Sequence, residues 1–158
     1  MSEYNYLKLK EHILELSNSS NFEQAIGEWD LESVEITEEF DNCPCGQQIK
    51  EHCYIRNNLN GNHTYVGNTC IKKFLNKDTG TLFEGLKRIK NNISANANEA
   101  VIEYANSKGF LFDKEYQFLL DTMRKRSLST KQSDWKKRIN HRILNEVVVN
   151  HRINKITS

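Results

Sequence analysis

Residues 43–74 read CPCGQQIKEHCYIRNNLNGNHTYVGNTCIKKF and hold all four cysteines of the chain, Cys43, Cys45, Cys53 and Cys70. Soft thiolates in a set of four are the usual ligands of tetrahedral zinc and, less often, of iron–sulfur clusters. Disulfides are a weaker interpretation, because nothing in the sequence indicates secretion. The other alternative is a set of four unrelated reduced thiols. The stretch predicts a small module built around one structural zinc ion.

The residues between the cysteines predict a tight turn followed by a β-hairpin. In Cys43–Gly46 the only proline of the chain fixes φ and the glycine permits positive φ, so two sulfurs can converge on one ion. One residue separates these two cysteines, where a zinc knuckle usually has two. Residues 48–56 and 63–66 are expected as strands, with their turn at Asn60-Gly61.

A short helix is expected directly after the hairpin. Thr69 is its predicted N-cap, which places Cys70 in the first turn. The N–H groups and the partial positive charge of a helix N-terminus favour thiolate at that position. A knuckle, a hairpin and a helix that supplies a ligand form a treble-clef-like arrangement.

Strand alternation decides between Cys53 and its neighbour His52 as the third ligand. Cys53 shares one face of its strand with Ile49 and Ile55, and this apolar face is expected to pack against the helix and the metal. His52 falls on the other face. We therefore predict Cys53 as the ligand, and we expect His52 and His63 to be solvated histidines.

The cysteines belong to a longer order of residues. The other members of this order are Glu28-Trp29, Gly46, Ile49, Asn57, Gly61, Gly67, Ile71 and the later segment Leu128–Gln132. In this order the chain resembles a group of small, mostly uncharacterised zinc-binding proteins that tailed phages, other large DNA viruses and low-GC bacteria encode. The resemblance covers most of the chain from shortly before Glu28, and the cysteines are its specific part. It implies a zinc fold and brings no agreed activity.

Composition indicates a soluble protein. No run of residues approaches transmembrane length, the N-terminus lacks the apolar segment of a signal peptide, and reduced cysteines favour a cytoplasmic location, which is the host cytoplasm if the protein is viral. We expect no membrane partner and no small-molecule substrate. Apolar residues make up only 37 %, so zinc is expected to supply stability that a small core lacks. The abundant asparagines are interpreted as codon bias.

The N-terminal region is predicted to extend the hairpin into a sheet. Residues 6–16 have the apolar spacing of an amphipathic helix, and residues 22–27 are expected as one further turn. Residues 29–37 alternate as a strand, which is expected to make a three-stranded sheet with the hairpin. The acidic run at residues 35–41 is interpreted as a solvated loop.

The second half of the chain is predicted to be all-helical. A capping box at Thr81–Glu84 opens the first helix, and residues 96–107 form the second, with Gly109 as its stop. Asp113 is the predicted N-cap of the third. A second capping box at Ser129–Gln132 opens a long helix, on which Trp135, Ile139, Ile143 and Val147 form an apolar stripe. The fold is therefore α+β, and two domains are expected, 1–78 with the zinc module and 79–158 with the helices.

Charge is distributed unevenly along the chain. Residues 1–60 hold 4 Lys and Arg against 12 Asp and Glu, whereas residues 61–158 hold 18 against 9. Such an asymmetry indicates an acidic and a basic surface, or halves whose charges cancel locally. The last two helices form an αα-hairpin or a helix-turn-helix-like pair whose basic outer surface suits phosphates. The predicted nucleic-acid contacts are Lys131, Lys136, Lys137, Arg138 and Arg142, with Arg56, Lys72 and Lys73 beside the zinc module. A solvated helix face is the alternative.

Catalysis is not expected. The sequence lacks the motifs of P-loop enzymes, serine hydrolases and zinc proteases, and four cysteines leave zinc no open position for water. A ββα-metal nuclease needs histidines on the hairpin and on the next helix, and the helix after Cys70 has none. The prediction is therefore a non-catalytic zinc protein that binds DNA or RNA. An adaptor that binds a host protein and a virion component are the alternatives.

Overall fold

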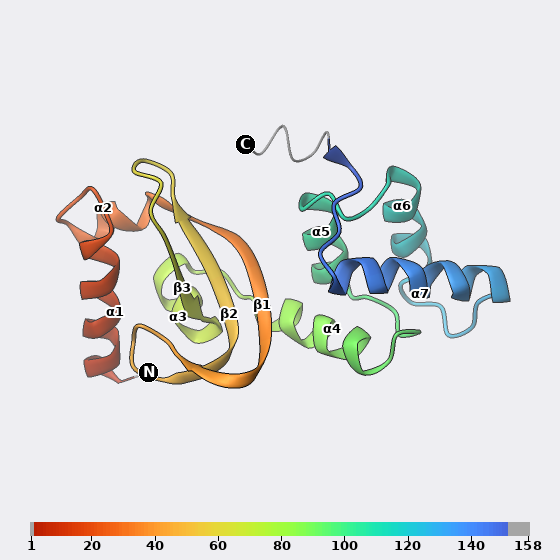
Figure 1. Cartoon of the computed structure of the whole chain (residues 1–158), viewed down its shortest axis with the longest axis horizontal. Helices are drawn as coiled ribbons and strands as arrows, with labels where there is room; N and C mark the ends of the chain where they lie inside the picture. Colours follow the sequence, from red (N-terminus) through yellow and green to blue (C-terminus); the bar gives the residue numbers. More distant parts are fainter. Residues whose placement is uncertain (1, 152–158) are drawn as a thin grey trace. The chain divides into compact units, whose positions relative to one another are not determined.

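The computed structural model describes residues 2–151 (Figure 1). The chain divides into two compact units, Met1–Thr79 (unit 1) and Gly80–Ser158 (unit 2), one residue beyond the expected boundary. Unit 1 contains a sheet and helices, and the described part of unit 2 contains helices, so the fold is α+β, as predicted. No helix within the described residues is both long and apolar enough to cross a membrane.

Unit 1 is built around a three-stranded antiparallel sheet with the strand order β1-β2-β3, which confirms the predicted sheet. The central strand β2 pairs with β1, where Asn57 lies opposite Trp29, and with β3, where Arg56 lies opposite His63. In chain order the elements are α1 (Glu3–Glu15), α2 (Phe22–Ile26), β1 (Trp29–Asn42), β2 (Gln48–Asn57), β3 (His63–Gly67) and α3 (Asn68–Leu75).

The β2–β3 hairpin forms as its turn residues predict. Gly61 has a φ of 76°, a conformation that suits glycine, and the Asn57 N–H closes the turn on the Asn62 carbonyl at 2.8 Å. Cys53 and Ile55 on one face of β2 are fully buried, as predicted, and Ile49 on the same face is half-buried. Helix α3 follows β3 directly (Figure 1) and places Cys70, Ile71 and Phe74 in the same core.

Two expectations for unit 1 are wrong. The acidic run continues strand β1 to Asn42 in place of a loop, with a register shift between Ile36 and Asp41 that leaves its carboxylates exposed. Helix α3 begins two residues earlier than expected, so that Gly67 occupies the N-cap position without a side-chain hydrogen bond and Thr69 lies inside the first turn. Cys70 keeps its predicted place near the helix start.

A polar network ties the start of β1 to the hairpin and to the loop after α1. The Glu28 carboxylate accepts from the Asn18 N–H at 2.7 Å, from the Ser19 N–H at 2.9 Å and from Asn57 Nδ2 at 2.9 Å. These hydrogen bonds lower the pKa of Glu28, and the one from Asn57 has the largest effect. Asn57 is fully buried, and its Oδ1 also accepts from the Leu59 N–H at 2.9 Å. The Glu28 carboxylate therefore links three segments of unit 1, and the Asn57 amide ties it to the hairpin turn.

Unit 2 consists of four described helices around its own apolar core: α4 (Gly80–Asn91), α5 (Glu99–Ser107), α6 (Asp113–Thr122) and α7 (Thr130–Leu144). Fully buried side chains from each of them, and from the turn before α6, fill this core: Phe83, Ile89, Ile102, Phe110, Leu111, Leu119 and Ile139. Trp135 of α7 stacks on Phe118 of α6 at 4.2 Å between ring centroids. The apolar stripes of the sequence therefore pack in the core, except for Val147, which is 48 % exposed.

Helix ends in unit 2 follow the sequence in part. Ser129 and Gln132 form the predicted capping box, and Gly109, at a φ of 80°, follows the end of α5. The other expected caps are wrong. Thr81 lies inside α4, and Phe112 stands at the N-cap of α6, where Glu115 Oε1 accepts from its N–H at 3.0 Å. Helix α7 ends at Leu144, before the expected end at Val147.

Replacing Asn57 by alanine is expected to destabilise unit 1 by about 2 kcal/mol, because buried partners lose their hydrogen bonds. Chemical denaturation followed by circular dichroism measures this change. Asn58→Ala is the matched control, since the neighbouring Asn58 is exposed, and it is expected to cost less than about 0.5 kcal/mol. Equal losses for the two variants would contradict the role given to Asn57.

Candidate metal centre and basic pocket

Three of the four cysteines converge in unit 1. The sulfurs of Cys43, Cys45 and Cys70 all lie within 4.8 Å of one another, and the three residues are buried. The Cys43 and Cys70 sulfurs are 3.5 Å apart, and both residues are free thiols. In a tetrahedral site with Zn–S bonds of about 2.3 Å, neighbouring sulfurs lie about 3.8 Å apart. The cluster therefore has the spacing of a thiolate metal site.

Local backbone geometry brings these sulfurs together. The Gly46 N–H donates to the Cys43 carbonyl at 2.8 Å, and the Cys43 N–H donates to the Gln47 carbonyl at 2.8 Å. Gly46 has a φ of 99°, which explains the glycine in this turn. The Gly67 N–H at the start of α3 donates to Cys43 Sγ at 3.4 Å. The turn and the start of α3 thus meet at the Cys43 sulfur. The turn forms with only one residue between Cys43 and Cys45.

The cluster favours negative charge on sulfur. The hydrogen bond between the Cys43 and Cys70 sulfurs lowers the pKa of Cys43 to about 6, and the N–H groups of Cys45 and Gly67 act in the same direction. The same hydrogen bond raises the pKa of Cys70, and burial raises the pKa of Cys45. One thiolate held between two thiols is an arrangement that a bound cation would stabilise further.

Cys53 lies apart from the three clustered sulfurs. It is fully buried on β2, and its sulfur is 3.7 Å from Thr79 Oγ1. Burial raises the pKa of Cys53 to about 11, and the charge of Cys43 adds to that shift, so the two sulfurs interact electrostatically. The structure thus brings three of the four predicted ligands together and buries the fourth in the same unit. Cys53 as a ligand stays a prediction.

The two histidines of the hairpin have different environments. The expectation of a solvated His52 is wrong, because the residue is only 2 % exposed and its ring packs on Tyr65 at 4.8 Å. Its Nε2 lies 3.3 Å from Asp41 Oδ2. His63 is exposed, and its Nδ1 lies 3.1 Å from Glu32 Oε2. Strand parity gave the correct face for His52 but could not show that Tyr65 covers it.

Two of the predicted nucleic-acid contacts form contacts within unit 2, and one of them is buried and the other half-buried. Lys136 is only 2 % exposed. Arg142 forms an ion pair with Glu115, and its Nη1 donates to the Phe110 carbonyl at 3.2 Å. The other predicted contacts are exposed or half-buried: Arg56, Lys72, Lys73, Lys131, Lys137 and Arg138. Arg142 is thus a structural residue of unit 2.

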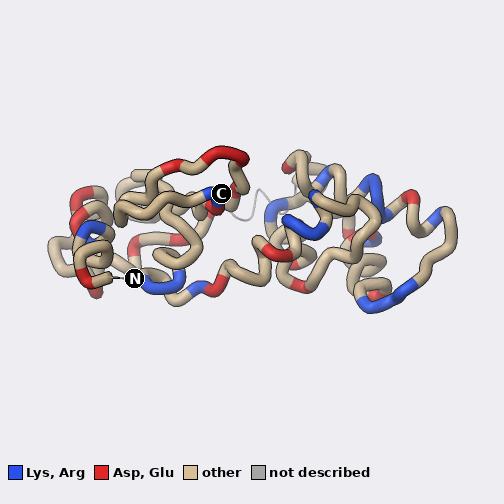
Figure 2. Tube along the Cα trace, turned by 90° about the horizontal axis from the view of Figure 1, so that it is seen from below, with Lys and Arg blue, Asp and Glu red and all other residues tan. Residues whose placement is uncertain are grey.

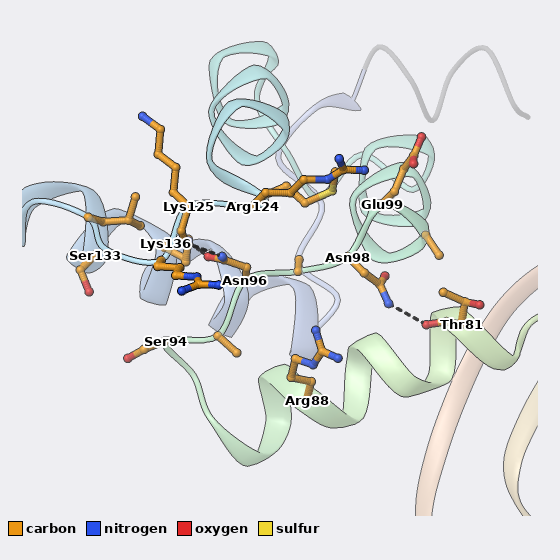
Figure 3. A pocket seen from close by; sticks show the side chains of 16 residues that line it. Thr81, Arg88, Ser94, Asn96, Asn98, Glu99, Arg124, Lys125, Ser133 and Lys136 are labelled. Atoms are coloured by element: carbon orange, nitrogen blue, oxygen red, sulfur yellow. Dashed lines mark hydrogen bonds between the residues drawn. The ribbon is translucent and has the colours of Figure 1, made fainter.

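Unit 2 contains a cavity of ≈ 840 Å³ that the sequence did not predict (Figure 3). Helix α4, the segment before α5, the loop after α6 and helix α7 all contribute to its wall. Its charged lining residues are five cations and one carboxylate: Arg88, Arg124, Lys125, Arg126, Lys136 and Glu99. Four of these cations are exposed, and none of those four forms an ion pair within the described residues. The cavity, termed the basic pocket below, is therefore strongly positive.

Asparagines hold the wall of the basic pocket. Asn140 Nδ2 donates to the carbonyls of Ile93 and Ala95, both at 2.9 Å. Asn96 Nδ2 donates to the Lys125 carbonyl at 2.9 Å, and Asn98 Nδ2 donates to the Thr81 carbonyl at 2.9 Å (Figure 3). These asparagines therefore stabilise the wall through side-chain hydrogen bonds. Asn96 and Asn98 were expected inside the helix predicted over residues 96–107, but α5 begins at Glu99 with Asn98 as its N-cap, which leaves Asn96 in the segment before the helix.

No model of a known protein family matches the chain, and no curated protein or solved structure shows significant similarity to it. The resemblance to small zinc-binding proteins of phages and large DNA viruses stays a prediction from the sequence.

Replacing Lys136 by methionine is expected to raise the free energy of unfolding of unit 2 by about 1 kcal/mol. The reason is that a buried ammonium has a neutral amide as its partner, so that removing the charge removes a desolvation cost. Thermal unfolding in phosphate-free buffer measures the change. Lys137→Met, at the half-buried neighbour, is the control. A loss of more than about 1 kcal/mol in Lys136→Met would contradict this account.

Proposed function

We propose that unit 1 binds one structural zinc ion through Cys43, Cys45, Cys53 and Cys70. The convergence of three buried sulfurs is the observation that supports this proposal. Four thiolates are a donor set that suits zinc and leaves no open position for chemistry. Tight turn, hairpin and ligand-bearing helix give a treble-clef-like order, with zinc joining the turn to α3. The ion is assigned a structural role and no catalytic one.

Zinc removal is expected to unfold unit 1, because the free energy of metal binding is part of the free energy of folding in such modules. The purified chain is expected to hold one zinc per molecule, and Cys70→Ser is expected to lose it. Metal analysis by mass spectrometry and circular dichroism in the presence of a chelator measure both effects.

The Cys53→Ser variant tests whether zinc has four sulfur ligands or three. It is expected to release zinc at lower chelator concentration than the wild type. His52→Ala is the matched control and is expected to retain zinc, since the His52 ring packs on Tyr65. Loss of zinc in His52→Ala with retention in Cys53→Ser would show that the ligand assignment is wrong.

We further propose that the protein binds nucleic acid through the basic surface of unit 2. The basic pocket, with five cationic side chains and one carboxylate, is the observation that carries this proposal. Phosphate contacts from Lys and Arg supply most sequence-independent affinity for nucleic acid. Figure 2 shows the contrast between the units, with acidic residues along β1 and basic segments in unit 2. The exposed cations of α7, Lys131 and Arg138, extend the same unit's positive charge.

Replacing Arg124, Lys125 and Arg126 by glutamine is expected to weaken binding and its salt dependence. Each lost phosphate contact makes the log–log dependence of affinity on salt shallower by almost one, so the triple variant is expected to lose about 2 to 3 from the slope. Fluorescence anisotropy with DNA and RNA oligonucleotides over a range of salt concentrations measures this change.

Glutamine at Lys8, Lys10 and Lys50 of unit 1 is the matched control, because it removes the same charge from the acidic unit. This variant is expected to bind like the wild type. The proposal would be wrong if the wild type failed to bind at low salt, or if its affinity did not depend on salt. Equal weakening of binding in both triple variants would show that the basic pocket is not the nucleic-acid-binding surface.

A specific observation in unit 1 favours a second function, an adaptor that binds a basic partner protein. A cavity of ≈ 510 Å³ on the sheet is lined by Tyr54, Tyr65 and Glu32, a combination that suits a lysine or arginine side chain. Strand β1 is at the edge of the sheet and carries the exposed Phe40 within its acidic run. Binding of a lysine-rich peptide that Tyr54→Ala abolishes would support this function. A role as a virion component would instead appear as a fixed copy number in purified particles.

A further inference from the structure

The basic pocket contains a buried cation without a counter-charge. Lys136 is 2 % exposed, and within the described residues its ammonium has a single hydrogen-bond partner, Asn96 Oδ1 (Figure 3). The Asn96 carbonyl is neutral. A buried charge is stable in a protein when it is paired with an opposite charge or coordinates a ligand. An aliphatic side chain would fill the same space at lower cost, so packing alone does not explain a lysine here.

The surroundings of Lys136 are arranged before any ligand arrives. Asn96, which accepts from the ammonium, is itself held by its bond to the Lys125 carbonyl at 2.9 Å. Asn140, one helical turn after Lys136 on α7, fixes the carbonyls of Ile93 and Ala95. The buried ammonium, the segment before α5 and the basic loop after α6 are therefore linked by hydrogen bonds. A ligand that enters this pocket meets donors that need little rearrangement.

The size and charge of the pocket select the class of ligand. A cavity of ≈ 840 Å³ is large enough for a nucleotide. Arginine forks from Arg88, Arg124 and Arg126 suit the oxygens of phosphate, and a phosphomonoester carries a charge of about −1.5 to −2 at neutral pH. A phosphodiester within a strand carries less charge, and a concave pocket receives a strand end more readily than a continuous backbone. Five cations against one carboxylate are thus best matched by a terminal phosphate.

We propose that the basic pocket binds a phosphomonoester dianion, with Lys136 and Asn96 at the inner wall and the arginines around it. The phosphate belongs to the end of a nucleic-acid strand or to a free mononucleotide, since both present the same chemistry. The strand-end form of this inference rests on the proposed nucleic-acid binding of unit 2. It adds a preference for strand ends that a basic surface alone does not give.

The test compares single-stranded oligonucleotides that differ in one terminal group. Using the full chain, anisotropy titrations are made with a 5′-phosphorylated, a 3′-phosphorylated and an unphosphorylated oligonucleotide of the same sequence, and adenosine monophosphate and inorganic phosphate serve as competitors. One phosphorylated form is expected to bind about tenfold more tightly than the unphosphorylated form, because its dianion adds charge-assisted hydrogen bonds. Adenosine monophosphate is expected to compete with that form.

Two lysine variants of α7 connect the preference to the pocket. Lys136→Met is expected to lose the tenfold preference, while Lys131→Met, outside the pocket, is expected to weaken the phosphorylated and unphosphorylated forms alike and so to keep it. Circular dichroism confirms that both variants fold. Replacing Lys136 by arginine retains the charge, and partial recovery of the preference in that variant would separate a charge effect from an effect of packing.

The outcomes distinguish this inference from the function on which it rests. Equal affinity for all three oligonucleotides, with salt-dependent binding intact, overturns the terminal-phosphate site and leaves nucleic-acid binding in place. Absence of oligonucleotide binding, with adenosine monophosphate bound in a calorimetric titration and lost in Lys136→Met, overturns the nucleic-acid function and supports a site for a free nucleotide. Absence of binding to any of the probes overturns both.

Discussion

Three sulfurs meet in unit 1 although they come from two segments that are 25 residues apart in the sequence, counted from Cys45 to Cys70. The turn after β1 supplies Cys43 and Cys45, and the start of α3 supplies Cys70. The Gly67 N–H and the Cys43–Cys70 hydrogen bond stabilise a thiolate there, and they leave the group with negative charge in a buried place. A bound cation would convert that cost into a cross-link between turn and helix.

The two units differ in the side chains that hold their segments together. In unit 2 the apolar residues of four helices meet directly, and asparagine side chains secure the irregular segment between α4 and α5. No cysteine is present in this part of the chain, so its stability cannot come from a thiolate site. Against that background Lys136 is an exception, because within the described residues its buried charge has no opposite charge as a partner, whereas the buried Glu115 carboxylate is paired with Arg142. Destabilising features retained in a well-packed unit are commonly tied to binding.

Sequence patterns predicted what depends on local rules and failed where a distant segment decides the outcome. The hairpin turn at Asn60-Gly61, the stop at Gly109 and the cap at Ser129 need only the residues beside them. Lys136 was assigned to an outer surface because one apolar stripe of α7 was visible in the sequence. The helix in fact buries a second, polar face through Lys136 and Asn140, which contact the segment at residues 93–96. Periodicity counts apolar residues, so it cannot detect a helix face that is buried through hydrogen bonds.

The opposite charges of the two units have separate physical consequences. On β1, an edge strand, exposed carboxylates oppose pairing with another strand and repel phosphate. In the basic pocket the cations face a partly enclosed space, where their attraction for an anion is screened less than on an open surface. Interactions between exposed charges fade beyond about 8 Å at physiological salt, so the charges close to a site, and not the sum over the whole chain, decide its attraction for an anion. A net charge near zero for the whole chain is therefore compatible with strong local attraction for phosphate.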